Sequence, residues 1–288
     1  MIAGVDNDSV VYLNGEYLRL GEARISVLDR GFIFGDGVYD VVPVYGRKPF
    51  RMGEHLARLQ RSLKAIRIET GWSAGDWEDL VQGLLARSAL QDCTVYLHVT
   101  RGAAPREHSF PTQPVQPTIF GMVSSLSRPA AVNRERGLTA VSMDDERWLH
   151  CEIKSISLLG NVLAKQYATD AGADEVVQFR DGHLSEGSSC NLWVVKYGIL
   201  RAPVRDRMIL EGIRYAYLME LAAAAGIPFE ARPISRLEVG QADELLLTSA
   251  TREILPITRL DGRPVGTGSP GPVYARLRAD YDRAIAAL

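Results

Sequence analysis

The chain has 288 residues, of which 46% are apolar and 24% are charged, and its formal net charge at pH 7 is −2. This composition is typical of a globular protein with one large domain or two domains of ordinary size. The balanced charge argues against a nucleic-acid-binding or anionic-membrane-binding protein, which would need a strong positive field.

The cysteines and the N-terminus indicate the compartment. Cys93, Cys151 and Cys190 are too few and too dispersed for a disulfide framework, so we expect reduced thiols. Residues 1–8 lack the basic and apolar regions of a secretory leader. No apolar run approaches the roughly 20 residues of a membrane helix. We therefore expect a cytoplasmic protein.

Hydrophobic periodicity predicts strands and helices in the first half of the chain. The expected strands are residues 10–13, 16–18, 38–45, 95–99 and 117–126. The first two flank Asn14-Gly15, a pair that accepts the positive φ angles of a tight turn. Leu56, Leu59, Leu63 and Ile66 recur at helical spacing, and Ser73 is a plausible N-cap for a second helix.

The second half predicts a similar mixture. We expect strands at residues 138–143, 175–179, 191–195 and 245–248, and helices at 158–171, 212–225 and 272–288. The turn Asp181-Gly182 is expected to join the strands at 175–179 and 191–195. Strict βαβ alternation is absent. The sequence thus predicts an α+β protein with an N-terminal domain (1–127), a linker (128–136) and a C-terminal domain (137–288) that meet at a cleft.

Lys154 is the residue whose surroundings first suggest chemistry. It lies among apolar neighbours at the expected end of a strand, where its charged form loses hydration and its amine can act as a nucleophile or base. Downstream, Glu186 is followed by Gly187, Ser188 and Ser189, and a carboxylate there could keep a ring nitrogen protonated. Together they suggest a pyridoxal phosphate (PLP) enzyme. Each residue alone also fits an ordinary surface lysine or turn glutamate.

Seven segments along nearly the whole chain resemble the fold-type IV, or class IV, PLP-dependent aminotransferases. They are DRGFIFGDGVYD (29–40), EHLARL (54–59), TRGAAPREH (100–108), RWLHCEIKS (147–155), SEGSS (185–189), ILEGI (209–213) and TSATREI (248–254). Within that family, the loop at 100–108 most resembles that of the enzymes acting on D-amino acids. The resemblance implies two α+β domains with PLP in the cleft between them.

The resemblance implies a role for each cofactor residue. Lys154 would form the Schiff base with PLP and move the substrate proton. Arg58 would bind the phosphate, and Glu186 would pair with the pyridine nitrogen. The remaining cofactor positions implied by the resemblance are Ser188, Ser189, Leu210, Ile213, Arg214, Ala250 and Thr251. Arg214 and Ala250 stand where relatives carry threonine, so at these two positions we expect contacts from the backbone instead of the side chain.

Tyr39, Val41, Arg106 and His108 are the substrate residues that the resemblance implies. Tyr39, Arg106 and His108 would donate to the substrate carboxylate and so select one enantiomer. In the family the loop with Arg106 and His108 reaches the site of the neighbouring subunit, which implies a homodimer. Asp40 replaces a glutamate of the D-amino acid enzymes, a change that affects the surroundings of the site.

The implied reaction is transamination between a D-amino acid (D-alanine or D-glutamate) and a 2-oxo acid (2-oxoglutarate or pyruvate). Alternatives with the same fold are a branched-chain L-amino acid aminotransferase, an (R)-amine aminotransferase and 4-amino-4-deoxychorismate lyase. A non-catalytic PLP-binding protein is an alternative of another class. The histidines have no metal-ligand spacing, so no metal site is expected.

Overall fold

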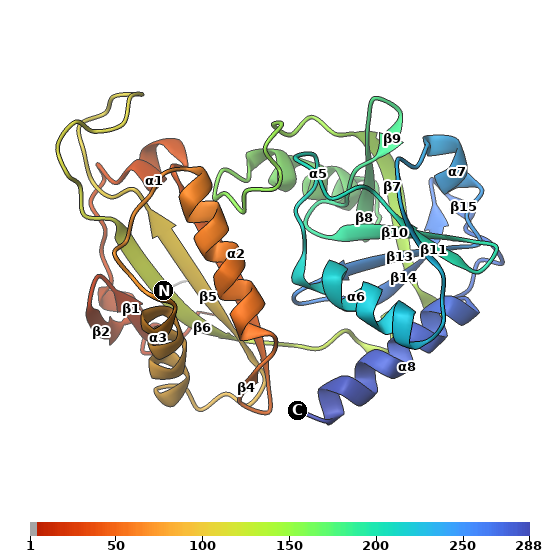
Figure 1. Cartoon of the computed structure of the whole chain (residues 1–288), viewed down its shortest axis with the longest axis horizontal. Helices are drawn as coiled ribbons and strands as arrows, with labels where there is room; N and C mark the ends of the chain where they lie inside the picture. The colour runs from red at the N-terminus through yellow and green to blue at the C-terminus, as the bar shows by residue number, and fades with distance from the viewer. Residues whose placement is uncertain (1–4) are drawn as a thin grey trace. The chain divides into compact units, whose positions relative to one another are not determined.

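The computed structural model describes residues 5–288. Residues 1–4, which belong to the N-terminal segment discussed above, lie outside this range. The described chain forms two compact units. The first contains residues up to Ser127 together with Ile153–Ser157, and the second contains Arg128–Glu152 and Leu158–Leu288. Each unit combines helices with a sheet, which confirms the predicted α+β class (Figure 1).

The first unit is built on a sheet that has six strands within the described residues. In spatial order they are β2 (Glu16–Arg19), β1 (Val10–Leu13), β6 (Thr118–Ser125), β5 (Cys93–Thr100), β3 (Gly37–Tyr45) and β4 (Lys48–Pro49). All neighbouring strands are antiparallel. The helical elements of this unit are η1 (Leu20–Glu22), α1 (Arg30–Phe34), α2 (Met52–Ala65) and α3 (Ala74–Ala86).

Alternation along the strands decides which face of this sheet is buried. Val95, Leu97 and Val99 of β5 pack against residues of α2 and α3 in the core, as their spacing predicts. Tyr96 and His98 therefore lie on the opposite face, which also carries a cavity. The hairpin turn is confirmed, with φ of 49° at Asn14 and 101° at Gly15. So is the capping box of Ser73 at the start of α3.

The second unit is built on a larger sheet, nine-stranded over the described residues. In spatial order its strands are β12 (Phe229–Ala231), β11 (Ile199–Ala202), β10 (Asn191–Lys196), β13 (Glu244–Ser249), β14 (Glu253–Leu260), β7 (Leu138–Asp144), β8 (Glu175–Arg180) and β9 (His183–Leu184), with β15 (Arg263–Pro264) paired to β14. Its helices are α4 (Ala131–Arg136), α5 (Leu159–Asp170), α6 (Ile213–Ala224), α7 (Arg236–Gly240) and α8 (Pro272–Ala286).

Two parallel pairs in this sheet are joined by helices. The chain passes from β7 through α5 to β8, and from β11 through α6 to β12. One expectation was wrong: the turn Asp181-Gly182 joins β8 to the short β9, and the strand that begins at Asn191 pairs with β11 and β13. The intervening residues form the irregular segment that carries Glu186.

Both faces of the second sheet are buried. On one face, Trp193 lies 4.5 Å from the ring of Tyr215 on α6, centroid to centroid. On the other face, alternate residues of the central strands pack with residues just before and within α7. This second core includes Leu192, Val194, Leu245, Leu247, Ile234 and Val239. The central strands consequently consist of apolar runs without polar alternation.

Ile153–Ser157 groups with the first unit rather than with the sequence around it. Ser155 forms an antiparallel bridge to Val38 at the edge of β3. The N–H of Ile156 donates to the carbonyl of Gly37 at 3.1 Å, and Ile153 packs on the first core. The predicted linker, 128–136, belongs to the second unit and includes α4.

The described residues were also searched for membrane-spanning segments. Among residues 5–288, no helix combines enough length with enough apolar character to cross a bilayer.

Candidate functional site

The backbone of Lys154 is fixed on both sides by the first unit. Its N–H donates to Ser62 Oγ at 3.2 Å, and its carbonyl accepts the N–H of Tyr39 at 3.0 Å. The amine, Nζ, lies 4.1 Å from the centroid of the Tyr39 ring. The expected strand end is wrong: residues 151–157 form an irregular segment with a single bridge. The structure thus brings Lys154 and Tyr39, two candidates far apart in sequence, into contact.

Arg58 is buried on α2, where it forms a two-pronged pair with Asp40 of β3. Arg58 Nε donates to Asp40 Oδ2 at 2.9 Å, and Nη2 donates to Oδ1 at 2.8 Å. His55, one turn earlier, places Nδ1 2.7 Å from Asp40 Oδ1. Because side chains four residues apart share a helix face, Arg58 lies one turn from Ser62, the residue that holds the Lys154 backbone.

The Asp40 carboxylate carries the charge that orients Arg58. Its burial is complete and alone would raise its pKa, but the Arg58 guanidinium and His55 together hold the pKa of Asp40 well below its ordinary range. Asp40 is therefore ionised at neutral pH. The pair fixes one edge of the guanidinium, which makes Asp40 a determinant of where Arg58 points.

Arg106 and His108 lie exposed on the long loop between β5 and β6, which extends past the end of the sheet in Figure 1. The ring of His108 lies 5.4 Å from that of Phe34, and the Arg106 guanidinium lies 5.5 Å from the same ring. Arg30 anchors the loop by donating to the Glu107 carbonyl at 2.6 Å. Within residues 5–288, no hydrogen bond or ring contact joins Tyr39 to either candidate.

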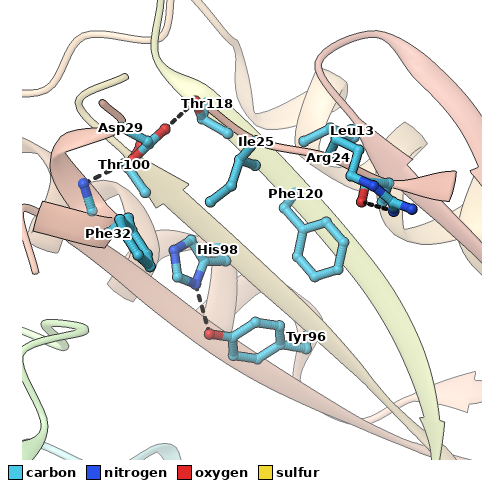
Figure 2. A pocket seen from close by; sticks show the side chains of 12 residues that line it. Leu13, Arg24, Ile25, Asp29, Phe32, Tyr96, His98, Thr100, Thr118 and Phe120 are labelled. Carbon is cyan, nitrogen blue, oxygen red and sulfur yellow. Dashed lines mark hydrogen bonds between the residues drawn. The ribbon is translucent and has the colours of Figure 1, made fainter. Parts of the chain in front are cut away.

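Tyr39 and Val41 lie on the sheet face opposite α2 and α3. Tyr39 is paired with His98 across β3 and β5, and its ring lies 5.8 Å from that of Tyr96. The same face carries a cavity of about 420 Å³, shown in Figure 2. Its lining includes Ile25, Asp29, Phe32, Tyr96, His98 and Phe120.

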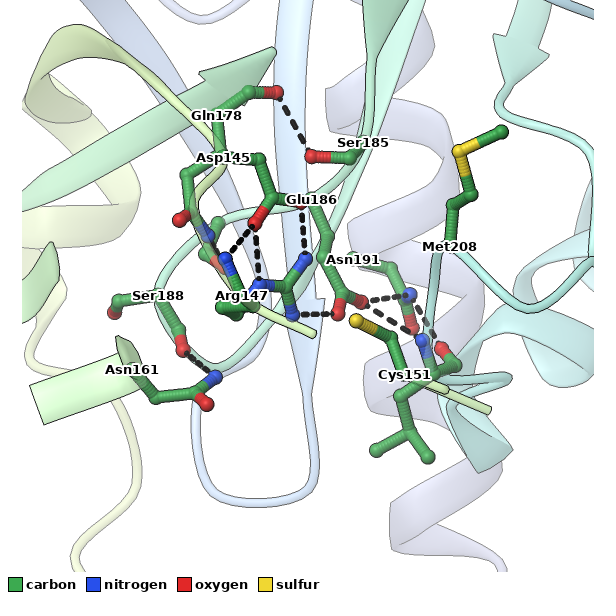
Figure 3. A network of polar contacts seen from close by, with 12 residues as sticks. Asp145, Arg147, Cys151, Asn161, Gln178, Ser185, Glu186, Ser188, Asn191 and Met208 are labelled. Carbon is green, nitrogen blue, oxygen red and sulfur yellow. Dashed lines mark hydrogen bonds and ion pairs between the residues drawn. The ribbon is translucent and has the colours of Figure 1, made fainter. Parts of the chain in front are cut away.

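Glu186 is the centre of a polar network in the second unit (Figure 3). Arg147 Nη1 donates to Glu186 Oε1 and is itself held by Asp145. The other oxygen, Oε2, accepts the N–H of Leu210 at 3.1 Å and contacts Asn191 Nδ2 at 3.3 Å. Burial raises the pKa of Glu186 above its ordinary value, although Arg147 opposes that shift. A cation brought near this carboxylate would stabilise its ionised form.

Ser188 and Ser189 belong to the turn that follows Glu186, and only Ser188 is buried. The Ser188 carbonyl accepts Asn161 Nδ2 at 2.6 Å. The carbonyl of Gly187 accepts Gln178 Nε2 at 2.8 Å. The turn is therefore held by side chains from α5 and β8, although its own sequence indicates only a small polar loop.

The candidate phosphate residues of the second unit lie where α6 begins and where β13 turns into β14. Ile213 is the first residue of α6, so its N–H belongs to the helix N-terminus that favours anions. Arg214 is buried and donates to the carbonyl of Ala250 at 3.4 Å, which links these two segments. Thr251 is exposed in the turn. Leu210 is tied to the Glu186 network by its N–H and by its carbonyl.

Sequence reasoning assigned no role to the residues that orient the candidates. These are His55 and Ser62 on α2, and Asp145, Arg147 and Asn191 around Glu186. Arg147 and His55 stand within the segments that resemble the family, so the motifs contained a signal. Asn191 and Ser62 had none, because their partners are distant in the chain.

Comparisons with known proteins agree on one family. The model of amino-transferase class IV matches residues 37–260. The D-alanine aminotransferase of Staphylococcus haemolyticus is 37% identical over 275 residues, which cover 96% of this chain and 97% of that protein. The D-alanine aminotransferase of Bacillus licheniformis is 34% identical over 275 residues and 96% of each chain.

Solved structures share the fold. A branched-chain amino acid aminotransferase from T.th. with pyridoxamine 5′-phosphate is 25% identical, covers 96% of this chain and 94% of that chain, and superposes with a TM-score of 0.90. The Escherichia coli branched-chain amino acid aminotransferase, 24% identical over 96% of this chain and 95% of that chain, has a TM-score of 0.92 and shows the fold alone.

Proposed function

Since the chain belongs to the class IV aminotransferase family, we propose that it transfers the amino group of a D-amino acid to a 2-oxo acid with PLP as cofactor. D-alanine and D-glutamate are the proposed donors, and 2-oxoglutarate and pyruvate the acceptors. The observation that carries this proposal is the similarity to D-alanine aminotransferases over 96% of the chain. The branched-chain enzymes resemble it at lower identity, chiefly in fold.

The residues present fit the chemical groups of PLP. The cofactor offers an aldehyde, a phosphate and a pyridine nitrogen, and the chain offers an amine at Lys154, a guanidinium at Arg58 and a buried carboxylate at Glu186. When bound, PLP supplies a covalent link to amines and a ring that accepts electrons from the substrate. A Cβ at Gly212 would lie 2.3 Å from Asn191 Oδ1, so glycine is needed where α6 begins.

Lys154 is the proposed catalytic residue. Hydrogen bonds to Ser62 and Tyr39 hold its backbone, so the point at which the side chain is attached is fixed. Its amine would hold the cofactor covalently and, when free, would move the proton at the substrate Cα.

Glu186 is proposed to hold the proton on the pyridine nitrogen. Arg147, Asn191 and the Leu210 N–H fix both oxygens of the carboxylate, so its direction is set before the cofactor arrives. Its raised pKa shows that burial disfavours the negative charge in the absence of another cation. A protonated pyridine nitrogen within hydrogen-bond reach would supply the positive charge that stabilises the ionised carboxylate.

The phosphate is assigned to Arg58, to the N–H groups of Ile213 and Arg214, and to Thr251. The Arg58 guanidinium is oriented by Asp40, and the helix N-terminus adds donors that favour an anion. Ser188, Ser189 and Ala250 are proposed to approach the cofactor through their backbone, and Leu210 to contact the ring. The small size of Ser188, Ser189 and Ala250 supports the first role. The hydrogen bond from the Leu210 N–H to Glu186 supports the second.

Tyr39, Arg106 and His108 are proposed to bind the substrate carboxylate, beside a pocket wall at Val41. Arg106 and His108 lie on an exposed loop anchored to α1, without a link to Tyr39 in the described chain. This arrangement supports a homodimer in which the loop serves the other subunit. An exposed apolar stripe on α5 also supports association with a second subunit. The stripe comprises Leu159, Val162, Leu163 and Tyr167.

We also propose a cytoplasmic location. The cysteines at 93, 151 and 190 are all buried free thiols, as expected for a protein from a reducing compartment.

The substrate assignment is tested by the first half-reaction. PLP-loaded protein is mixed in single turnover with D-alanine, L-leucine or (R)-1-phenylethylamine, and the loss of visible absorbance is followed. Fastest conversion of D-alanine supports the proposal, whereas faster conversion of L-leucine or of the amine would assign the chain to another branch of the family. No spectral response to any amine would leave a PLP-binding protein without transaminase activity.

Sharing of the site between subunits is tested by complementation. Arg106→Ala and Lys154→Ala homodimers are each expected to be inactive. Mixed subunits contain one intact site per heterodimer, so an equal mixture that exchanges freely should recover about a quarter of the wild-type activity. No recovery, with exchange verified by mass spectrometry, would place Arg106 and Lys154 of one subunit in the same site.

A further inference from the structure

We propose that Glu175 and Arg252 are positioning residues whose ion pair joins the turn carrying Glu186 and Ser188 to the turn carrying Ala250 and Thr251. The inference rests on the proposed function, because it assigns these two turns to the cofactor. Neither Glu175 nor Arg252 is proposed to touch PLP. Their task is to hold the ring partner and the phosphate partners of the second unit in one arrangement.

Glu175, the first residue of β8, contacts the Glu186 turn through both oxygens. It is fully buried. Its Oε1 accepts the N–H of Ser188 at 2.9 Å and that of Val176 at 2.9 Å. The thiol of Cys190 lies 3.6 Å from Oε2. The Glu175 carboxylate thus accepts the Ser188 N–H, which has no backbone partner in a neighbouring strand of the described chain.

The packing of Gly187 supports the same view. A Cβ at Gly187 would lie 2.4 Å from Cys190 Sγ and 3.3 Å from the Glu175 carboxyl carbon. The N–H of Gly187 donates to the Cys190 carbonyl at 2.8 Å. The turn therefore packs against Cys190 and Glu175 without room for a side chain at Gly187.

Arg252 connects the same carboxylate to the second turn. Its Nη2 donates to Glu175 Oε2, and its side chain is 26% exposed while that of Glu175 is 0% exposed. The N–H of Arg252 donates to Ser249 Oγ at 3.1 Å, which closes the turn around Ala250 and Thr251. One guanidinium therefore ties that turn to β8 and, through Glu175, to Ser188.

The charges of the pair are matched to its burial. Burial alone would raise the pKa of Glu175, but Arg252 and the N–H groups of Ser188 and Val176 hold that pKa below its ordinary value. Burial raises the pKa of Cys190 well above its ordinary range, and Glu175 adds to this shift. Glu175 is thus the ionised partner of Arg252 at neutral pH, and Cys190 is a neutral thiol beside it.

The test uses three variants and a matched control. Glu175→Gln keeps one acceptor but removes the charge, Arg252→Gln removes the opposite charge, and the double variant removes both. The control is Glu244→Gln. Glu244 is also buried in the second unit and accepts two backbone N–H groups, from Val273 and Tyr274, but it caps α8 instead of a cofactor turn.

The measurements on each full-length protein are the PLP dissociation constant of the apo form, its thermal midpoint, and KM and kcat for D-alanine at saturating PLP. We expect Glu175→Gln and Arg252→Gln each to weaken PLP binding by about 10-fold or more, by analogy with the loss of metal affinity when the hydrogen-bond partners of metal ligands are removed. The double variant should lose less than the product of the two effects. The control should lose thermal stability but change PLP affinity by less than about twofold.

Two results would overturn the inference. One is PLP affinity within about twofold of wild type in both single variants, and the other is an equal loss of affinity in the control at equal loss of stability. Arg252→Gln alone decides the question if Glu175→Gln does not fold. A wild-type chain that binds no PLP would instead contradict the proposed function, and this inference with it.

Discussion

Replacing Asp40 by asparagine tests how the first unit holds its phosphate ligand. Asp40 is fully buried and receives two hydrogen bonds from Arg58, at 2.8 and 2.9 Å, while His55 Nδ1 lies 2.7 Å away. The amide removes the negative charge and replaces one acceptor oxygen by a donor. Arg58 is then a buried cation facing a neutral group.

The expected cost follows from that burial. Removing one partner of a buried ion pair destabilises a protein by about 3–5 kcal/mol. Because the amide keeps one acceptor oxygen, we expect a cost of about 3 kcal/mol for this variant. At 2–4 °C per kcal/mol, the thermal midpoint of the apo protein should fall by about 6–12 °C at pH 7. Reorientation of Arg58 should also weaken PLP binding by about 10-fold.

The pH dependence has a definite sign. The folded pKa of Asp40 is depressed, so its stabilising effect is present above the ordinary carboxyl pKa of about 3.9 and is lost as pH falls through the folded value. The gap in stability between wild type and Asp40→Asn should therefore narrow as the pH falls below about 4.

The assay is differential scanning calorimetry of apo protein across pH, with PLP titration at pH 7. Asp29→Asn is the control. Asp29 is also buried in the first unit, where it accepts the N–H of Gly31 and the hydroxyls of Thr100 and Thr118. That variant should lose stability but retain PLP affinity. Wild-type stability or wild-type PLP affinity in Asp40→Asn would show that Asp40 does not hold Arg58 in place.

Three further substitutions address the reaction. Glu186→Gln should retain PLP but slow the half-reaction with D-alanine by about 10²–10³-fold, because the ring nitrogen loses its anionic partner; an unchanged single-turnover rate would remove Glu186 from the mechanism. Tyr39→Phe should raise KM for D-alanine by roughly 5- to 100-fold through loss of one donor to the carboxylate, and an unchanged KM would argue against that contact. Lys154→Ala should abolish steady-state turnover, measured as pyruvate formed from D-alanine, and full retention would refute its assignment.

Local patterns in the sequence were enough to predict most of the regular elements. The hairpin at Asn14-Gly15 and the cap at Ser73 are set by residues adjacent in the chain, and both are confirmed. The region after Gly182 was misassigned, because the short β9 and the irregular turn after it carry little periodicity. Their geometry comes from Glu175 and Gln178, which act from the neighbouring strand.

The candidate site shows the same division. Lys154, Arg58 and Glu186 could be proposed because they stand in segments that resemble a family. The contacts that orient them could not be predicted, because each joins distant parts of the chain: Ser62 to Lys154, and Asp40 to Arg58. For the same reason, the grouping of Ile153–Ser157 with the first unit could not be read from a linear pattern.

The most direct test of the account is the position of the covalent link to PLP. PLP-loaded wild-type protein is reduced with borohydride, digested, and mapped by mass spectrometry. We expect irreversible loss of visible absorbance and a single phosphopyridoxyl-modified peptide, with the label on Lys154. A label on Lys64, Lys165 or another lysine, or the absence of any label in PLP-loaded protein, would contradict it.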